Sequence, residues 1–209
     1  INEYMGLIAS QGSEPMAQVL ETHASVASVQ LPDRAIRPEV IREVIKACRG
    51  AGSLSIVYAS MSSPQLHERV ISPHTLVYTG FRWHVRAYCH KRQAFRDFLL
   101  SRIDRTPKLS LESAPAADVD ALWQEQITLT LIPNTLLTTA QQALVERDFG
   151  MPDGRLQLTV RKALAHYTLQ RYQAAITEQE AKRVREHPLQ LLPADRVKLD
   201  PYLFNSSSE

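Results

Sequence analysis

The sequence has few cysteines, few glycines and no long apolar run. Its two cysteines, Cys48 and Cys89, have no disulfide or zinc-ligand spacing, so we expect a reducing cytoplasm rather than secretion. Seven glycines provide no glycine-rich phosphate loop, and the hydrolase and metalloprotease motifs are missing. No apolar stretch approaches the roughly 20 residues of a membrane helix. We therefore predict no catalytic residues, no metal, no cofactor and no membrane span.

The composition is that of a globular protein, 44% hydrophobic and 22% charged, and 209 residues are enough for two small domains. The formal charge of +2 is unevenly distributed. Residues 54–105 contain eight Lys and Arg against three Asp and Glu, a balance of +5, and four of the seven histidines, whereas the flanking segments are slightly acidic. This balance favours an anionic partner for the middle segment, with a solvated basic face as the alternative.

The segment Phe81–His90 alternates between two kinds of side chain, which is typical of a β-strand. One row is apolar and contains Trp83, Val85, Ala87 and Cys89. The other row is polar and mostly basic and contains Arg82, His84, Arg86, Tyr88 and His90. We expect the first row, Trp83 included, in the core. The second row is expected to face outward, where it suits an anion or a nucleic acid.

The same middle segment predicts one helix followed by several short strands. The apolar spacing of Pro38–Gly50, with proline at the start and basic residues and glycine at the end, indicates an amphipathic helix. Strands are expected at residues 54–59, 69–71, 75–78, 81–90 and 95–103. Short turns between them favour a small curled antiparallel sheet or barrel.

A second compact unit is predicted after a linker marked by Ser113–Asp118. Residues 126–132 and 154–160 alternate as strands, and residues 162–176 are expected to be helical. The helix between the strands is expected to be capped by Asn134 or Thr135 and to end at Gly150. Its expected apolar face consists of Leu136, Leu137, Ala140 and Leu144. The predicted class is α+β, with β-α-β-α order in this unit.

The run from Leu54 to Ile103 resembles the WYL domain of bacterial transcription regulators. The residues that carry the resemblance are Tyr58-Ala59-Ser60, Ile71 to Leu76, Trp83 to Cys89 and Phe95 to Ile103. The Trp-Tyr-Leu triplet of the family stands here as Trp83-His84-Val85, a departure at two of three positions. The finer pattern resembles the repressors that guard phage-defence operons.

The resemblance implies a small Sm-like antiparallel β-barrel that binds an anionic ligand, a nucleotide or nucleic acid. It also implies a following α+β domain that forms a homodimer, and a preceding winged helix-turn-helix that binds operator DNA near the nucleoid. Residues 1–35 show no helix-turn-helix pair and the chain starts at Ile1, so we expect a piece of a longer protein. The predicted boundaries are connector 1–37, WYL domain 38–107, linker 108–122 and dimerisation domain 123–209.

The predicted ligand-binding residues are Tyr58, Ser60, Arg69, His74, His84, Arg86, Arg96 and Arg102. The arginines carry most weight because a planar guanidinium matches a phosphate with two parallel hydrogen bonds. For each arginine, a salt bridge to Glu68, Asp97 or Asp104 is an equal alternative. Core packing is the alternative for Tyr58, and a capping or solvent-facing role is the alternative for His74.

Two functions follow from these predictions. The first is the ligand-sensing and dimerisation portion of a transcriptional repressor. The alternative is a stand-alone barrel that binds single-stranded nucleic acid.

Overall fold

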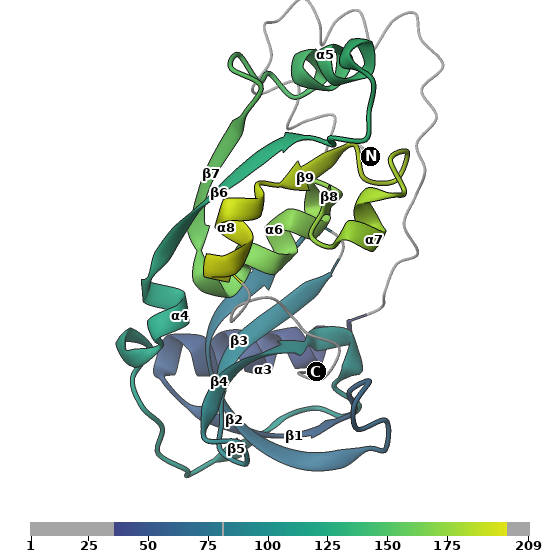
Figure 1. The fold of residues 1–209 in the computed structure, drawn as a ribbon. Coiled ribbons are helices and arrows are strands. Elements are labelled where there is room, and N and C mark those ends of the chain that lie inside the picture. The colour runs from purple at the N-terminus through teal and green to yellow at the C-terminus, as the bar shows by residue number, and fades with distance from the viewer. Residues whose placement is uncertain (1–35, 81, 200–209) are drawn as a thin grey trace, which may run out of the picture. The chain divides into compact units, whose positions relative to one another are not determined.

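The computed structural model describes residues 36–80 and 82–199 (Figure 1). These residues form two β-sheets, one before and one after residue 120, each with its own hydrophobic core. The predicted connector lies outside the described residues except for Ile36 and Arg37, as do Phe81 and the last ten residues of the predicted C-terminal domain. No helix within the described ranges is long and apolar enough to cross a membrane.

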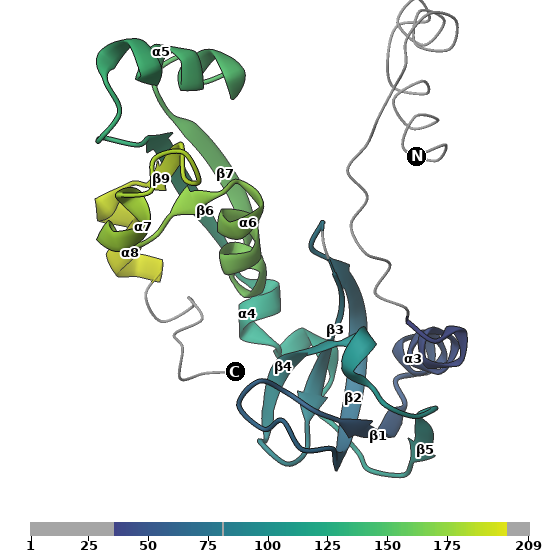
Figure 2. The same ribbon diagram turned by 90° about the vertical axis from the view of Figure 1, so that its right-hand side faces the viewer.

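The predicted helix is confirmed as α3, Pro38–Gly50. Proline in the first turn has no amide hydrogen to leave unpaired there. Glu39 in the first turn and Arg49 in the last turn complement the helix dipole. The buried residues of α3 pack into the core of the first sheet, against one of its faces (Figure 2), and are Val40, Val44 and Ala47.

The first sheet has five antiparallel strands in the order β4-β3-β2-β1-β5. They are β1 Ser53–Tyr58, β2 His67–Tyr78, β3 Trp83–Cys89, β4 Ala94–Leu99 and β5 Lys108–Ser110. No pairing in the described part of the chain joins β4 to β5, so the sheet is open and the expected closed barrel is wrong. After β4 the chain turns into the 3-10 helix η1, Leu100–Arg102, which replaces the end of the predicted strand 95–103. It then meets β1 only through a single bridge between Tyr58 and Ile103.

Strand β3 confirms part of the predicted alternation. Val85, Ala87 and Cys89 are buried in the core, as expected. Trp83 is not: it is 43% exposed, because it lies at the hairpin end of the strand and packs its ring on Tyr78 at 4.9 Å. The polar row also differs from the expectation, since His84 and Arg86 are buried rather than facing solvent. The face opposite α3 is therefore covered at these two positions.

The second sheet has the order β7-β6-β9-β8, and only the β8–β9 pair is parallel. Its strands are β6 Gln126–Pro133, β7 Leu156–Arg161, β8 Ala174–Ala175 and β9 Leu189–Leu191. The helices of this part are α4 Ala121–Gln124, α5 Thr139–Asp148, α6 Ala165–Arg171, α7 Glu178–Ala181 and α8 Pro193–Leu199. The second sheet and its helices, together with the first sheet, confirm the predicted α+β class.

Helix α5 starts later than predicted. Its cap is Thr138, which forms a reciprocal capping box with Gln141, whereas Asn134 is fully buried before the helix. Leu136 and Leu144, expected on a buried face, are 60% and 50% exposed. The predicted helix 162–176 is shorter than expected, because the 3-10 turn η3, Lys162–Leu164, precedes α6.

The predicted linker is partly ordered onto the first sheet. Lys108–Ser110 pairs with β1 as the edge strand β5. Further on, the 3-10 helix η2, Ala117–Val119, leads to Asp120, which is buried and caps α4 by accepting a hydrogen bond from the Trp123 amide. The composition predicts a linker here, but the buried carboxylate of Asp120 fixes the C-terminal end of this segment.

Candidate functional site

A buried ion-pair network occupies the covered face of the first sheet. Arg86 on β3 lies directly opposite Asp97 on β4, so the strand register points both side chains to the same side. The Arg86 guanidinium donates to Asp97 Oδ1 at 3.3 Å. It also donates to both oxygens of Asp120, from Nε at 2.7 Å and from Nη2 at 3.0 Å. The side chains of these three residues are at most 8% exposed.

His74 extends this network from β2. The register of β2 shifts between Pro73 and Thr75, and this bulge turns the imidazole toward Asp120, to whose Oδ2 it donates from Nε2 at 3.2 Å. Burial lowers the pKa of His74, so the ring is neutral at pH 7. With its proton on Nε2, the ring accepts at Nδ1 from the Thr75 hydroxyl at 2.9 Å.

The pKa values of the two acids of the network are shifted in opposite directions. Burial raises the pKa of Asp97, and the attraction of Arg86 does not fully offset this effect. Burial also opposes the charge on Asp120, but hydrogen bonds from Arg86 and His74 outweigh it and lower the pKa of Asp120. Asp120 is therefore the carboxylate that holds its charge most firmly, and its direct partner is Arg86.

Helix α6 of the second part reaches the same face. The Tyr167 hydroxyl donates to Asp97 Oδ2 at 3.2 Å, and the Tyr167 ring lies 5.0 Å from the ring of His84. Burial, followed by the positive charges of Arg82 and Arg102, lowers the pKa of His84 to about 4. We refer to Arg86, Asp97, Asp120, His74 and Tyr167 together as the Arg86 network.

The pKa of His84 makes stability depend on pH. In the unfolded chain His84 takes up a proton below about pH 6.5, but the folded protein resists protonation down to about pH 4. The free energy of unfolding should therefore fall by about 3 kcal/mol from this residue alone between pH 7 and pH 4. His84→Phe keeps an aromatic ring against Tyr167 and should flatten this slope in denaturant unfolding measured across that range. An unchanged slope in the variant would contradict the assignment.

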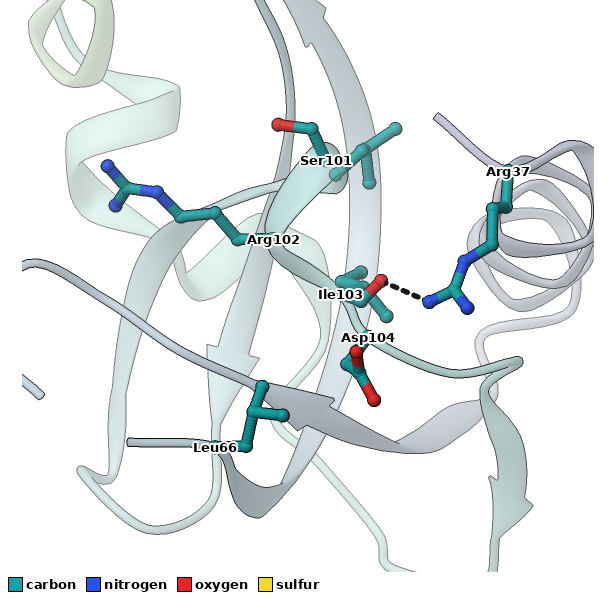
Figure 3. A pocket seen from close by; sticks show the side chains of 7 residues that line it. Arg37, Leu66, Ser101, Arg102, Ile103 and Asp104 are labelled. Carbon is teal, nitrogen blue, oxygen red and sulfur yellow. Dashed lines mark hydrogen bonds between the residues drawn. The ribbon is translucent and has the colours of Figure 1, made fainter. Parts of the chain in front are cut away.

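A separate pocket of about 280 Å³ lies beside η1 (Figure 3). It is lined by Arg37, Leu66, Leu100, Ser101, Arg102, Ile103 and Asp104. The Arg37 guanidinium donates to the Ile103 carbonyl at 2.8 Å, which fixes this arginine across the pocket from Arg102. The lining contains two guanidinium groups and a hydroxyl, which are groups that bind anions, together with the carboxylate of Asp104. The Arg102 side chain extends away from Arg37 (Figure 3).

Ser72, His90 and Glu112 lie near one another in the order of a hydrolytic triad. The directions of their hydrogen bonds, however, do not fit such a triad. Ser72 Oγ lies 2.8 Å from His90 Nε2, and His90 Nδ1 lies 3.9 Å from a Glu112 carboxylate oxygen. The Ser53 hydroxyl donates its only proton to the Glu112 carbonyl, so Ser72 must donate to Ser53 and accept from His90. His90 therefore does not act as the base that would activate Ser72.

Comparison with known families assigns the two parts of the chain. Residues 39–107 match the WYL domain, and residues 126–197 match the BrxR transcriptional regulator, C-terminal dimerization domain. The chain contains a WYL domain and a BrxR-type dimerization domain. The predicted resemblance to the WYL domain is thus confirmed, and the matched residues include β1 to β4 and all of α3 but Pro38, whereas β5 follows them.

The relatives of this chain are named as repressors. It is 37% identical over 192 residues to the DNA-binding transcriptional repressor CapW of Pseudomonas aeruginosa, which covers 92% of this chain and 63% of that protein. It is 37% identical to CapW of Escherichia coli (strain KTE188), over 86% of this chain and 59% of that protein. It is 38% identical to CapW of Stenotrophomonas maltophilia, over 75% of this chain and 52% of that protein. The chain thus spans between 52% and 63% of the length of these relatives.

Among solved structures, the proteasome accessory factor B/C of Arthrobacter aurescens matches 92% of this chain and 30% of that chain. The sequence identity is 19% and the TM-score 0.36, values that do not establish a common fold. The names of the dimerization family and of the CapW relatives are those of transcriptional regulators and not of enzymes, in agreement with the predicted regulatory role.

Three of the predicted ligand residues lie in the Arg86 network or in the pocket beside η1. His74 and Arg86 meet at Asp120, in the Arg86 network. Arg102 lines the pocket, and its charge acts on His84. Arg102 lies on η1 and not on the predicted strand 95–103, whereas Arg96 lies on β4 opposite Ala87.

The other predicted residues make local contacts. Tyr58 is buried with its ring edge-on to Phe98 at 5.2 Å, and its hydroxyl accepts from the Leu99 amide at 3.2 Å. Ser60 shapes the turn that follows β1 by accepting from the Ser63 amide. Arg69 contacts His67 and Cys89. Their role in ligand binding stays a prediction, and the observed contact of Tyr58 is the one given above as its alternative.

Three residues of the WYL domain site were missed by the sequence reasoning. Asp97 was considered only as an ion-pair partner, although its place opposite Arg86 follows from the hairpin register. Asp120 has a signal of its own, since an aspartate directly before Ala121–Gln124 is a preferred helix cap. Tyr167 had no signal, because nothing in the sequence indicates that α6 contacts the WYL domain.

Proposed function

We propose that this chain is the ligand-sensing and dimerisation portion of a cytoplasmic transcriptional repressor. The WYL domain would bind a nucleotide or short nucleic acid, the C-terminal domain would form a homodimer, and operator DNA would be bound by a further domain. The order of the two matched domains and the CapW relatives support this role. The observation that carries the ligand part is the pocket with Arg37 and Arg102 on opposite sides.

The dimer is supported by apolar side chains that the second part leaves in water. Leu136 precedes α5, Leu144 lies on α5 and Val197 lies on α8, and all three are at least half exposed. No residue of α5 is fully buried, although Val145 packs against the second core. Apolar residues of this kind are typical of a surface that a second subunit covers. The predicted boundaries 38–107, 108–122 and 123–209 are part of this proposal.

The ligand part is tested by one arginine and a matched control. We expect Arg102→Ala to weaken binding of a fluorescein-labelled, 5′-phosphorylated dinucleotide by at least about tenfold, because one charge-assisted contact is worth about 1.4 kcal/mol or more. The slope of log affinity against log salt should fall by about one. Arg92→Ala removes an exposed arginine outside the pocket and should change neither value. Equal losses in both variants, or no binding by the wild type, would overturn the pocket assignment.

The alternative, a module that binds single-stranded nucleic acid by itself, is favoured by the exposed pair Tyr78 and Trp83. Their rings pack at 4.9 Å on the hairpin end, where bases could stack on them. Oligonucleotide length separates the two functions. A sensor should be saturated by the dinucleotide, whereas a strand-binding module should gain affinity with each added nucleotide and lose this gain in Trp83→Ala.

A further inference from the structure

The contact between Arg86 and Asp120 has the form of a bound ligand. Asp120 places one carboxylate oxygen on Nε and the other on Nη2, which is the two-point contact that a phosphate makes with arginine. The Arg86 side chain is 5% exposed and that of Asp120 is 2% exposed, so no second anion has room at this edge of the guanidinium. An arginine that the sequence predicts as ligand-binding is therefore occupied by the chain itself.

Asp120 also lies in a segment that connects the two matched domains. Residues 117–124 form η2 and α4 and lead directly into β6. Within this segment Trp123 packs edge-on against His74 of the WYL domain, with ring centroids 5.5 Å apart. On the other side, the Arg161 guanidinium of β7 lies 4.8 Å from the centre of the Trp123 ring and donates to the Trp123 carbonyl. The segment is thus held by the WYL domain at Asp120 and by the dimerization domain at Trp123.

We propose that Asp120 is an internal ligand of Arg86 and that a phosphate-bearing ligand competes with it. When the phosphate takes the two donors of Arg86, Asp120 leaves with residues 117–124, and the hold on β7 through Trp123 changes. This inference rests on the proposed function and concerns a second anion site, at Arg86, which is separate from the pocket beside η1. Asp97 stays paired with Arg86 in both states, so the exchange replaces one anion by another without leaving the guanidinium unpaired.

The competition gives the protein two defined states, one with Asp120 on Arg86 and one with phosphate on Arg86. A ligand shifts a conformational equilibrium only by the difference between its affinities for the two states. When Asp120 is bound, the donors Nε and Nη2 of Arg86 are occupied. When Asp120 has left, these donors are vacant and accept phosphate. Asp120 gains full hydration on release, which partly offsets the loss of its contacts.

The test removes the charge of the internal ligand while keeping its shape. Asparagine still caps α4, so Asp120→Asn should fold, but it competes only weakly for Arg86. We expect the phosphorylated dinucleotide to bind Asp120→Asn at least about tenfold more tightly than the wild type. Asp118→Asn removes an exposed acid two residues earlier and is the matched control, with no expected change. An unchanged affinity of Asp120→Asn, or an equal gain in Asp118→Asn, would overturn the proposal.

A spectroscopic measurement follows the segment itself. The chain has two tryptophans, so in a Trp83→Phe background only Trp123 fluoresces. Saturating dinucleotide should shift the Trp123 emission to longer wavelength, and Asp120→Asn should show part of this shift without ligand. Binding that is lost in Arg102→Ala but moves neither Trp123 emission nor the affinity of Asp120→Asn would overturn the competition and leave the proposed function standing. Absence of binding in every variant would overturn both.

Discussion

Replacing Arg86 with methionine is expected to lower the free energy of unfolding by about 3–5 kcal/mol. Methionine fills much of the same space but leaves Asp97 and Asp120 buried without a cationic partner, and an unpaired buried charge is far more costly than a missing pair. Arg105→Met, at a position that is 74% exposed, should change stability by less than about 0.5 kcal/mol. Denaturant unfolding of both variants measures the difference.

The pH dependence of this loss identifies its cause. Without Arg86, the folded protein should hold both carboxyls with pKa values above that of about 4 in the unfolded chain. The folded state then resists ionisation, so the cost is largest at high pH and disappears as pH falls toward about 4. A deficit that stays constant from pH 8 to pH 5 would point to lost packing instead of unpaired charge.

Asn134→Ala is expected to be the second large effect, with a loss of about 3 kcal/mol. Asn134 is fully buried at the end of β6, and its side chain makes three hydrogen bonds. Its amide donates to the carbonyls of Ala181 and His187, and its oxygen accepts from the Leu136 amide. Alanine would leave these backbone groups without partners, at about 1 kcal/mol or more for each.

Thr135→Ala is the matched control for this position. Thr135 is the next residue and is exposed, and its amide and hydroxyl donate to Gln190. We expect a loss below about 1 kcal/mol from Thr135→Ala. Comparable losses in the two variants, measured by denaturant unfolding, would contradict the role assigned to Asn134.

Local patterns in the sequence predicted much of the secondary structure. Helix α3 follows from a proline start and a single apolar face, and β3, β6 and β7 follow from period-two alternation. The predicted element boundaries are wrong where contacts with residues far away in the sequence decide them. Asn134 looks like a helix cap, but it is buried by α7 and the segment before β9, while Thr138 caps α5.

The sequence reasoning named two residues of the Arg86 network, His74 and Arg86, but neither their partners nor the structure around them. Alternation places His84, Arg86 and their neighbours on one face, yet it does not say what covers that face. The cover is provided by Asp120, 34 residues from Arg86, and by Tyr167, 70 residues from Asp97. Such contacts depend on the fold of both domains. The predicted burial of Trp83 is wrong for a related reason, because its side chain belongs to the core-facing row but lies beyond the edge of the core.

Native mass spectrometry of the purified protein tests the central claim most directly, because it reports subunit number and bound anions together. The proposed function predicts a dimer, each subunit of which binds one phosphorylated dinucleotide, with bound dinucleotide lost in Arg102→Ala and retained in Arg92→Ala. A monomer that carries no anion and binds no dinucleotide would contradict it.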